Sequence, residues 1–567
     1  MKNSENGIVL GFMVMILIMI STLATLNLIK DTKTNNTLIL KEDDNLSLKL
    51  EDIELDGVKI KDNQELYEKF DDSNVEDLYI TVLPPSSENF VTFNELNTNV
   101  NITNEVYNND GLDSVSNIIL STEPEHNIKE ENATIEIRGQ SSRSSEQKSY
   151  KIKSLDNNVI WKDFKIVNLN KHFSDTLKIR NKLSFDYMEQ INNITSYRTK
   201  FVRLNIKDLS QGIDNVYKSY GLYTFIEQPN KEYLKNHNLN PSGYFYKAEF
   251  FEFYRYDDKI KLNTDPLYKK EDLESILEVR GNEDNSKLIE MLDAVNDYSR
   301  DINDVVNQYF DEDNMVTWLG INILMNNNDT NSRNFLIYSP LNSDKWFFIP
   351  WDYDNAWNVY EGEDSYEFGL ANYWGMVIFN RYFKYEENIN KLNKKIEELS
   401  EIINEENTIT MLETYYNLIG DVIYSAPDSQ YMKVPKEKYL EEVEYLGKLT
   451  ENNKNLYYKD LERPMPFFLY EYEEYEKDNL RFSWQSSYDI KEDNLTYEFI
   501  LSKDPKLENI VERVNTGTNI FCDIPKVISG KYYWTVIAYD SQGNFRKPFN
   551  KLEGETSYLG IKEVEIK

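Results

Sequence analysis

Two short apolar segments joined by a polar turn, with acidic motifs at both outer ends, constrain this chain more than any other feature. Residues 335–338 (FLIY) and 346–349 (WFFI) are rich in aromatic and β-branched side chains, and residues 340–345 between them are turn-forming. The segment 328–334 (NDTNSRN) precedes the first apolar segment, and 350–355 (PWDYDN) follows the second. The sequence therefore predicts a β-hairpin that carries carboxylates at both ends.

The spacing within these motifs is compatible with metal-dependent phosphoryl transfer. Asn334 stands five residues after Asp329, and Asp352 stands 23 residues after Asp329. Protein kinases use a catalytic-loop Asp, an Asn five residues later and an Asp beyond a hairpin to hold the Mg²⁺ of a nucleotide. Carboxylate and amide oxygens suit Mg²⁺ or Mn²⁺. Asp and Asn also cap turns and helices, so the spacing alone leaves a structural role open.

Composition excludes several classes of protein. A chain of 567 residues, 40% hydrophobic and 13% aromatic, can form roughly three or four packed domains. The formal net charge of -35 repels a phosphate backbone, so we expect no nucleic-acid partner and favour a basic protein partner. The single cysteine, Cys522, excludes an internal disulfide, and three histidines argue against a zinc site or a His-based triad.

An uncharged apolar run near the N-terminus predicts a membrane segment. Residues 8–29 contain no charged side chain, and as a helix they would span about 33 Å. A cleaved signal peptide is the alternative, but its apolar region is normally shorter and ends at a small-residue cleavage site. We therefore expect one uncleaved transmembrane helix, a membrane partner, and a single-pass protein whose soluble part is extracytoplasmic. Lys2 on one side and Lys30 and Lys33 on the other give a weak charge bias, so a cytoplasmic-facing domain is the alternative.

Alternating segments before the acidic motifs predict strands, and longer periodic segments predict helices. The expected strands cover residues 78–83, 133–138, 149–153, 197–205 and 220–227. The expected helices cover residues 314–325 and 389–426. Residues 139–148 (GQSSRSSEQK) form a Ser-rich loop between two of these strands, where backbone N–H groups and cations can cover phosphates. An ordinary solvated hairpin turn has the same composition.

The order of these pieces resembles the spore coat protein H (CotH) kinase family, an atypical relative of the protein kinases. The resemblance covers roughly residues 78–451. It rests on residues 137–143 (IRGQSSR), 148–152 (KSYKI), 220–223 (YGLY), 243–247 (GYFYK), 328–334 and 346–354. Members of this family phosphorylate serines of spore coat proteins with ATP and a divalent metal. The resemblance therefore implies a Ser/Thr-directed phosphotransferase.

The resemblance also implies roles for individual residues. Asp329 corresponds to the catalytic carboxylate that accepts or orients the substrate hydroxyl, Asp352 to the metal-holding aspartate and Asn334 to the second metal ligand. Asp354 is a candidate helper or a turn former. The implied phosphate-binding positions are Ser141, Ser142, Arg143, Lys148, Lys151 and Glu227, with Glu227 as the ion-pair partner of one of the lysines.

One departure from the family pattern affects the Ser-rich loop. Family members commonly have an aromatic residue, Pro and two lysines before Ser-Tyr, whereas this chain has Ser145, Glu146, Gln147 and Lys148. Gln147 thus stands where the family has a basic residue, and the acidic Glu146 lies beside it. The change weakens the phosphate-binding face and favours a nucleotide-poor member of the family.

The C-terminal part predicts a separate β-sandwich. Residues 479–484, 495–502 and 530–540 alternate apolar and polar side chains and are separated by turns. They resemble a fibronectin type III-like domain, in which Trp484 and Trp534 would be core residues. The predicted fold class is α+β, an atypical protein-kinase-like domain followed by an all-β sandwich and preceded by one transmembrane helix. The predicted parts are an anchor (1–30), a linker or short β segment (31–72), a CotH kinase-like domain (73–455) and the sandwich (456–567).

Three functions remain open from the sequence. The first is an ATP- and Mg²⁺- or Mn²⁺-dependent Ser/Thr protein kinase that acts on Ser-rich, basic proteins of the spore coat or cell surface. The second is a catalytically degenerate scaffold, which Glu146 and Gln147 favour. The third is a carbohydrate-active enzyme with paired carboxylates, which leaves the basic Ser-rich loop without a role.

Overall fold

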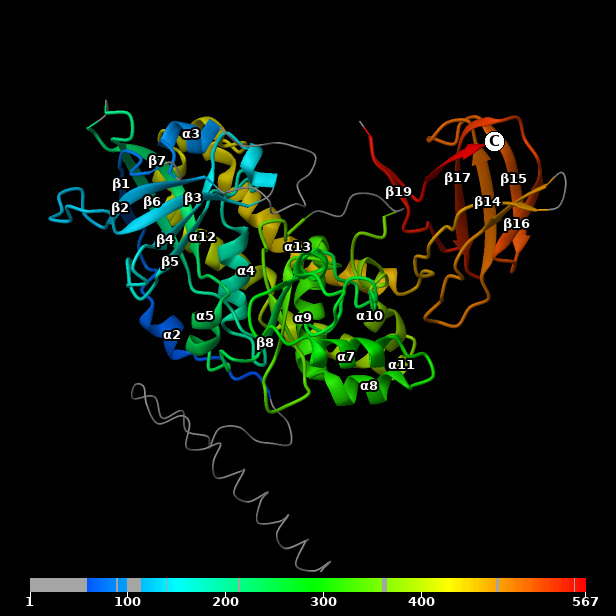
Figure 1. Cartoon of the computed structure of the whole chain (residues 1–567). Helices are drawn as coiled ribbons and strands as arrows, with labels where there is room; N and C mark the ends of the chain where they lie inside the picture. The colour runs from blue at the N-terminus through cyan, green and yellow to red at the C-terminus, as the bar shows by residue number, and fades with distance from the viewer. Residues whose placement is uncertain are drawn as a thin grey trace, which may run out of the picture. The chain divides into compact units, whose positions relative to one another are not determined.

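We describe the fold from a computed structural model of the chain (Figure 1). The structure describes residues 59–87, 90–98, 114–139, 141–212, 215–358, 365–475, 479–554 and 556–567. Residues 59–567 form one compact unit. The predicted anchor, residues 1–30, lies outside the described residues.

The first half of the unit is a closed seven-stranded barrel. Its strands, in barrel order, are β1 (Glu76–Val82), β2 (Val115–Ser121), β3 (Ala133–Arg138), β4 (Ser149–Ser154), β5 (Ile166–Asn170), β7 (Lys218–Ile226) and β6 (Thr199–Asp208). Neighbours are antiparallel except β1 and β6, which pair in parallel and close the barrel. Five of these strands confirm the segments predicted from alternation.

Alternation decides which side chains fill the barrel. Ala133, Ile135 and Ile137 of β3 are buried in the barrel core, whereas Glu136 and Arg138 point to its outer face. The same holds on β4, where the buried tyrosine and isoleucine alternate with Lys151 and Lys153. Because successive side chains of a strand point to opposite faces, one apolar set closes the core and one charged set remains outside.

Short helices flank the barrel. They are α2 (Glu65–Lys69), α3 (Phe93–Thr98), α4 (Arg180–Met188) between β5 and β6, and α5 (Lys231–Asn236) after β7. In the range predicted as a linker or short β segment, the described residues 59–72 contain helix α2. Asp72 at the end of this range forms a 2.5 Å ion pair with Lys182 of α4, which is buried. This segment is therefore part of the packing around α4.

The second half is mainly helical and holds the predicted hairpin. Its sheet has the order β11 (Phe347–Pro350), β10 (Phe335–Ser339), β8 (Tyr244–Ala248) and β9 (Leu277–Val279). Its helices are α6 (Lys270–Glu274), α7 (Ser286–Asn296), α8 (Ile302–Tyr309), α9 (Glu312–Leu324), α10 (Val377–Tyr382), α11 (Glu386–Ser400), α12 (Glu405–Ile423) and α13 (Tyr439–Asp460). Helix α9 confirms the predicted 314–325 segment, and the predicted 389–426 segment is divided between α11 and α12.

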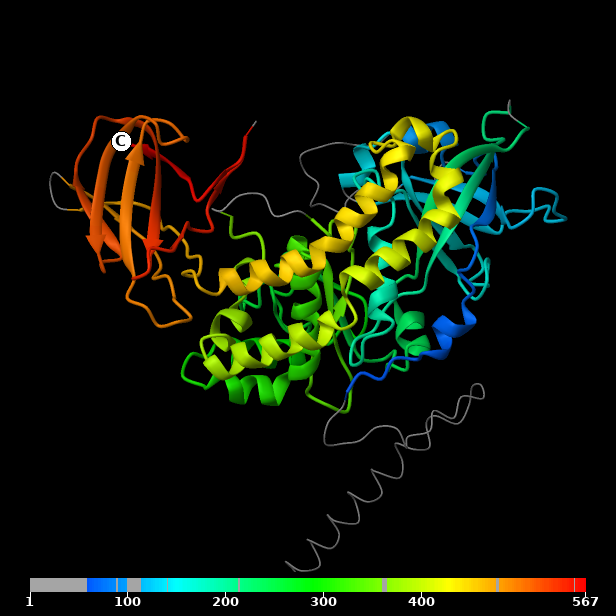
Figure 2. The same ribbon diagram turned by 180° about the vertical axis from the view of Figure 1, so that it is seen from behind.

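Helix α9 is central to the packing of this half, and helix α12 also contacts the first half. Helix α9 is buried from Asn314 to Leu324 and packs against α11, α13 and β11. Helix α12 packs against α13 and also contacts β7 and α4 beside the barrel, as Figure 2 shows. The loop that carries Asp329 therefore begins at the end of the most deeply buried helix.

The C-terminal residues form two packed sheets. One has the order β12 (Glu473–Tyr475), β13 (Asn479–Ser483), β16 (Phe521–Pro525), and the other contains β15 (Ile510–Gly517), β14 (Thr496–Ser502), β17 (Gly530–Tyr539), β18 (Phe545–Arg546) and β21 (Lys562–Ile566). A small pair, β19 (Lys551–Leu552) and β20 (Tyr558–Leu559), lies between β18 and β21 in sequence. Trp484 and Trp534 are buried in the shared core, as predicted. The likeness to fibronectin type III domains stays a prediction.

The predicted fold class needs one correction. Mixed helices and sheets followed by a β-rich C-terminus are present, but no helix among the described residues has both the length and the apolar composition to cross a bilayer. The longest of them, α13, is largely polar. The described helices therefore contradict the predicted transmembrane helix, membrane partner and single-pass localisation.

Candidate active site

The open end of the β10–β11 hairpin carries both predicted metal ligands. Phe335 pairs with Pro350 in the antiparallel register, so Asn334 and Asp352 leave the two strands at the same edge. Their backbones are both left-handed, with φ of 58° for Asn334 and 57° for Asp352. Asn and Asp tolerate this region better than other residues with side chains, but it remains uncommon. Sharp backbone turns on a rigid hairpin therefore set the direction of these two side chains.

Asp329 lies beside this edge, in the short helix η3 (Asn328–Thr330) between α9 and β10. The Asn334 Nδ2 group donates a 2.8 Å hydrogen bond to Asp329 Oδ2, and Arg333 Nε lies 3.9 Å from Oδ1. Burial raises the pKa of Asp329; Arg333 opposes the rise and Asp352 adds to it. The hydrogen bond fixes one oxygen of Asp329. The predicted catalytic residue and one predicted metal ligand are thus in contact.

Asp352 and Asp354 have carboxylates that no protein cation neutralises directly. Among the described residues neither carboxylate accepts a hydrogen bond or forms an ion pair. Burial raises the pKa of Asp352, with Arg138 and Lys247 opposing the rise. Burial also raises the pKa of Asp354, and Asp352 raises it further. Two adjacent, desolvated carboxylates without partners form a local environment that favours a cation.

The donor set fits a magnesium or manganese ion that is shared with phosphates. The part of the chain that the structure describes holds no group of three or more His, Cys, Asp or Glu side chains able to bind a metal. Mg²⁺ usually takes one or two protein carboxylates and completes its shell with water and phosphate oxygens. Asp352 and Asn334, with Asp354 available, match that requirement, whereas they would be too few for a closed all-protein site.

Arg138 supplies positive charge to the same region, and the sequence reasoning missed it. It is the last residue of β3, on the outer barrel face, and one of its guanidinium nitrogens donates to Asn170 Oδ1. Burial lowers its pKa to about 10, and Asp352 is the strongest opposing charge. The alternation along β3 could have placed Arg138 on the charged face.

The Ser-rich loop is folded on itself. Ser142 Oγ donates to the Arg138 carbonyl at 3.2 Å, Arg143 Nε donates to the Gly139 carbonyl at 2.7 Å, and Lys148 Nζ donates to the Arg143 carbonyl at 2.6 Å. Gly139 has φ of 88°, and a Cβ at this position would collide with Ser142 Oγ. The predicted turn is present as the 3₁₀ helix η2 (Ser141–Ser144). The side chains of Ser142, Arg143 and Lys148 therefore hold the shape of the loop through these hydrogen bonds.

Two other predicted positions, Lys151 and Glu227, each have a different ion-pair partner. Lys151 on β4 forms a 3.4 Å ion pair with Glu136 on β3, on the outer barrel face. Glu227, just after β7, accepts from Arg198 Nη2 at 2.7 Å and from Arg198 Nε at 3.0 Å, and it also contacts His237 at 3.2 Å. The predicted ion pair between Glu227 and one of the phosphate-binding lysines is therefore wrong. Arg198 precedes β6 by one residue and pairs with Glu227 across that barrel edge.

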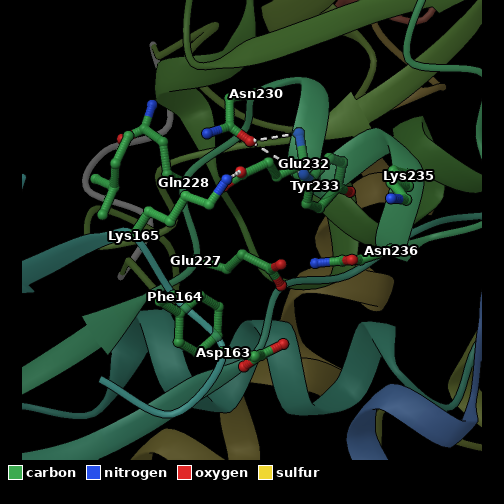
Figure 3. Close-up of a pocket in the computed structure, with 11 residues that line it drawn as sticks. Asp163, Phe164, Lys165, Glu227, Gln228, Asn230, Glu232, Tyr233, Lys235 and Asn236 are labelled. Carbon is green, nitrogen blue, oxygen red and sulfur yellow. Dashed lines mark hydrogen bonds and ion pairs between the residues drawn. The ribbon is translucent and has the colours of Figure 1, made fainter. Parts of the chain in front are cut away.

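Glu227 lines a polar cavity of about 200 Å³ at the connection between β7 and α5 (Figure 3). Lys165 and Gln228 lie on one side, and Asp163 and Glu227 lie on the other. Asn230 caps α5 by accepting hydrogen bonds from the first turn of that helix. The lining carries both positive and negative side chains, so the cavity favours neither an anionic nor a cationic ligand.

Gln147, the departure from the family pattern, has a structural partner. Its Nε2 group donates to Asp428 Oδ1 at 3.2 Å, and Lys171 Nζ donates to the same oxygen at 2.7 Å. Asp428 Oδ2 accepts from the Leu222 backbone N–H at 2.6 Å, where Gly221 leaves room that a Cβ would fill. A neutral amide suits a carboxylate that a buried lysine already neutralises. The substitution therefore ties the Ser-rich loop to η5 (Asp428–Tyr431).

The residues of this site lie within a known family. The family described as CotH kinase protein matches residues 135–457, which is more than half of the chain and includes the Ser-rich loop and the β10–β11 hairpin. The chain belongs to the CotH kinase protein family. Inner spore coat protein H of Bacillus subtilis (strain 168) is 24% identical over 237 residues, covering 41% of this chain and 60% of that protein.

CotH membership confirms the family resemblance and marks this chain as a kinase-like enzyme. The matched stretch spans less than two thirds of the Bacillus subtilis relative, and the matched family region ends before the C-terminal sheets. The roles of individual residues in this CotH chain are not set by the family match. They depend on the contacts described above.

Proposed function

We propose that this chain is an ATP- and divalent-metal-dependent Ser/Thr protein kinase of the CotH type. Asp329 accepts or orients the proton of the substrate hydroxyl, whose oxygen attacks the γ-phosphorus while the bond to the bridging β–γ oxygen breaks. Asn334 holds Asp329 in place through its 2.8 Å hydrogen bond. Little covalent chemistry is required of the protein, since phosphoryl transfer is mainly positioning and charge neutralisation.

Asp352 and Asn334, with help from Asp354, would hold the metal, and a bound Mg²⁺ or Mn²⁺ would neutralise phosphate charge. Arg138 adds a partly buried cation on the barrel side of the same region. Ser141, Ser142, Arg143 and Lys148 of the Ser-rich loop, and Lys151 on β4, are the candidates for contacts to phosphates. Because Arg143 and Lys148 donate to loop carbonyls here, they would have to exchange those partners for phosphate oxygens.

One observation carries this proposal. Asp352 and Asp354 are partly buried, two residues apart and without hydrogen-bond or ion-pair partners among the described residues, while Asp329 is hydrogen-bonded at the same hairpin edge. Natural proteins normally pair buried charges, so an unpaired set at the end of a rigid hairpin favours a ligand cation over a structural role. The scaffold alternative gives these carboxylates no partner.

The substrate we propose is a basic, Ser-rich protein segment of the spore coat or cell surface. The net charge of -35 attracts Lys- and Arg-rich chains and repels acidic ones. The printed name of the Bacillus subtilis relative, an inner spore coat protein, supports the spore coat. The attacking group would be a serine or threonine hydroxyl.

The test is transfer of labelled phosphate from ATP to the chain itself and to a basic Ser-rich peptide, with Mg²⁺ or Mn²⁺. We expect Asp329→Asn and Asp352→Asn to abolish incorporation, because they remove the hydroxyl-orienting and the metal-holding carboxylate. Asp421→Asn is the matched control, since the Asp421 side chain is fully exposed on α12 and its carboxylate pairs with Lys436 at 3.3 Å. No incorporation and no metal-dependent ATP binding by the unaltered chain would favour the scaffold alternative.

A further inference from the structure

The C-terminal module, defined as residues 465–567, is fastened to the segment that follows the acidic hairpin. Arg546 of β18 is buried and forms an ion pair with Asp460 at the end of α13, where both side chains are almost completely withdrawn from solvent. The same guanidinium donates a 3.0 Å hydrogen bond to the Ser365 carbonyl. Arg546 thus joins the module, helix α13 and residue 365 at one buried point.

Further contacts extend this attachment along residues 365–375. Tyr366 Oη donates a 2.7 Å hydrogen bond to the Phe549 carbonyl of the module. The Trp374 ring stacks on the Tyr488 ring with centroids 5.7 Å apart, and Trp374 is 3% exposed. The attachment therefore combines a buried charge pair, backbone carbonyl contacts and an aromatic stack.

The same segment supports the Asp329 loop from its other side. Asn372 Nδ2 donates to the Asn328 carbonyl at 3.1 Å, and Asn331 Nδ2 donates to Asn372 Oδ1 at 3.2 Å. Tyr373 Oη donates to the Asn327 carbonyl at 2.8 Å. Helix η4 (Ala371–Tyr373) thus holds the loop backbone before Asp329 and the Asn331 side chain after it.

We propose that the C-terminal module positions the Asp329 loop of this chain through residues 365–375. The module is then a working part of the active site and more than a spacer, although the family match stops at residue 457. Arg546 is the positioning residue, acting through the Ser365 carbonyl and η4. This inference rests on the proposed kinase function for its catalytic consequence, whereas its mechanical part stands on the contacts alone.

The energetics favour strong coupling at Arg546. Removing one partner of a buried ion pair leaves the other charge without compensation, which is much more disruptive than losing a surface pair. Asp460 is fully buried, and burial raises its pKa despite the opposing charge of Arg546. A module without Arg546 would therefore separate from α13 and release the Ser365 carbonyl.

The experiment uses the full chain with Arg546→Met and measures amide hydrogen exchange and phosphate transfer. We expect faster exchange in residues 365–375 and 327–331, because local opening becomes easier when their support is lost. We expect kcat to fall about ten-fold or more with the KM for ATP nearly unchanged. The Ser-rich loop is tied instead to η5, through the hydrogen bond from Gln147 to Asp428.

Arg481→Met is the matched control. Arg481 likewise pairs with an aspartate, Asp523, through two contacts of 2.7 Å each, but on the surface of the same module. It should leave exchange near Asp329 and kcat unchanged. Arg546→Lys should restore part of both readouts, since it keeps the charge but loses the fork of donors.

Unchanged exchange at residues 327–331 in folded Arg546→Met would overturn the proposal. If that variant does not fold, Tyr366→Phe decides, because it removes only the hydroxyl that reaches the Phe549 carbonyl; the same exchange response is expected at smaller amplitude, and no response overturns the proposal. If the unaltered chain transfers no phosphate, the proposed function fails and the exchange result alone decides the positioning role.

Discussion

The Glu227 carboxylate beside β7 is buried and the carboxylates at the β10–β11 edge are partly buried, yet among the described residues only the first is matched by cations. Glu227 contacts Arg198 and His237, and His237 also contacts Asp62 at 2.7 Å. Asp352 and Asp354 have no such partners among the described residues. The pKa of Glu227 is held down at about 2, because His237 and Arg198 outweigh the burial that would raise it.

This difference separates a structural network from a candidate site. Matched buried charges stabilise one arrangement of the chain, here the attachment of residues 59–70 to α5 and the barrel. Unmatched buried charges destabilise the empty protein and are retained where a ligand compensates them. The same physical property, burial of a carboxylate, therefore has opposite consequences for stability in the two regions.

The largest effect should come from breaking the matched group. Glu227→Gln leaves the buried Arg198 guanidinium and His237 without their shared counter-charge, so we expect the free energy of unfolding to fall by about 3–5 kcal/mol. Denaturant unfolding of the two proteins measures this. The matched control is Asp77→Asn, which breaks the 2.6 Å ion pair between Asp77 and Arg203. The Arg203 side chain is 46% exposed, so this pair lies at the surface. That change should cost about 1 kcal/mol or less.

The second effect is a pH dependence with a predictable sign. Burial alone would lower the pKa of His237, but Asp62 and Glu227 outweigh it and raise the pKa to about 9. A raised pKa contributes stability that is complete below the unfolded value near 6.5 and is lost as pH rises towards 9. The loss should be on the order of 3 kcal/mol, at about 1.4 kcal/mol per pKa unit. His237→Gln should remove it.

His172 provides the opposite sign within the same chain. Burial lowers its pKa to about 4, so its contribution is complete above pH 6.5 and is lost as pH falls towards 4. Unfolding curves of His172→Gln and His237→Gln between pH 4 and 10 should therefore diverge from the unaltered chain at opposite ends. Divergence of both at the same end would contradict the assigned environments.

A third prediction concerns the unmatched group. Asp354→Asn removes a desolvated carboxylate that Asp352 repels, so the metal-free chain should gain about 1–2 kcal/mol of stability. Metal-dependent phosphate transfer should fall in the same variant. Thermal unfolding without metal measures the first effect and transfer assays the second. A loss of stability would show that Asp354 has a structural partner and is not held for a ligand.

The smallest effect should appear in substrate capture. If the acidic surface attracts a basic Ser-rich peptide, raising ionic strength from about 0.05 M to 0.3 M should raise the peptide KM a few-fold, because the charges are then screened. The kcat should stay constant, since steering by the net charge acts on the capture of the peptide and not on the transfer step that follows. A neutral Ser-rich peptide is the control. An unchanged KM for the basic peptide would rule out steering by the net charge.

Local patterns predicted much of the fold. The strands on both sides of the Ser-rich loop, the hairpin at residues 335–350 and helix α9 were all predicted from alternation and periodicity, because these depend on neighbours within a few residues. Glu227 shows where this stops. Its position after β7 was predicted, but its partner Arg198 lies 29 residues earlier in the chain and meets it only across the barrel.

The membrane prediction failed for a different reason. It was based on an apolar run near the N-terminus, and the structure describes no helix that could cross a bilayer. The proposed coupling between Arg546 and the Asp329 loop had no sequence signal, since it depends on Ser365 and Asn372, which are ordinary polar residues without a motif. Such contacts join segments more than 40 residues apart and leave no periodic pattern.

The sequence by itself determined which side chains could hold a metal, because Asp329, Asn334 and Asp352 have fixed spacing around a hairpin whose strands form from local preference. The tertiary structure alone decided which charges are matched. Pairing in a low-dielectric interior depends on atoms brought within about 3 Å by the packing of distant segments. That packing places Arg198 and His237 against Glu227, and among the described residues it places no cation in an ion pair with Asp352 or Asp354.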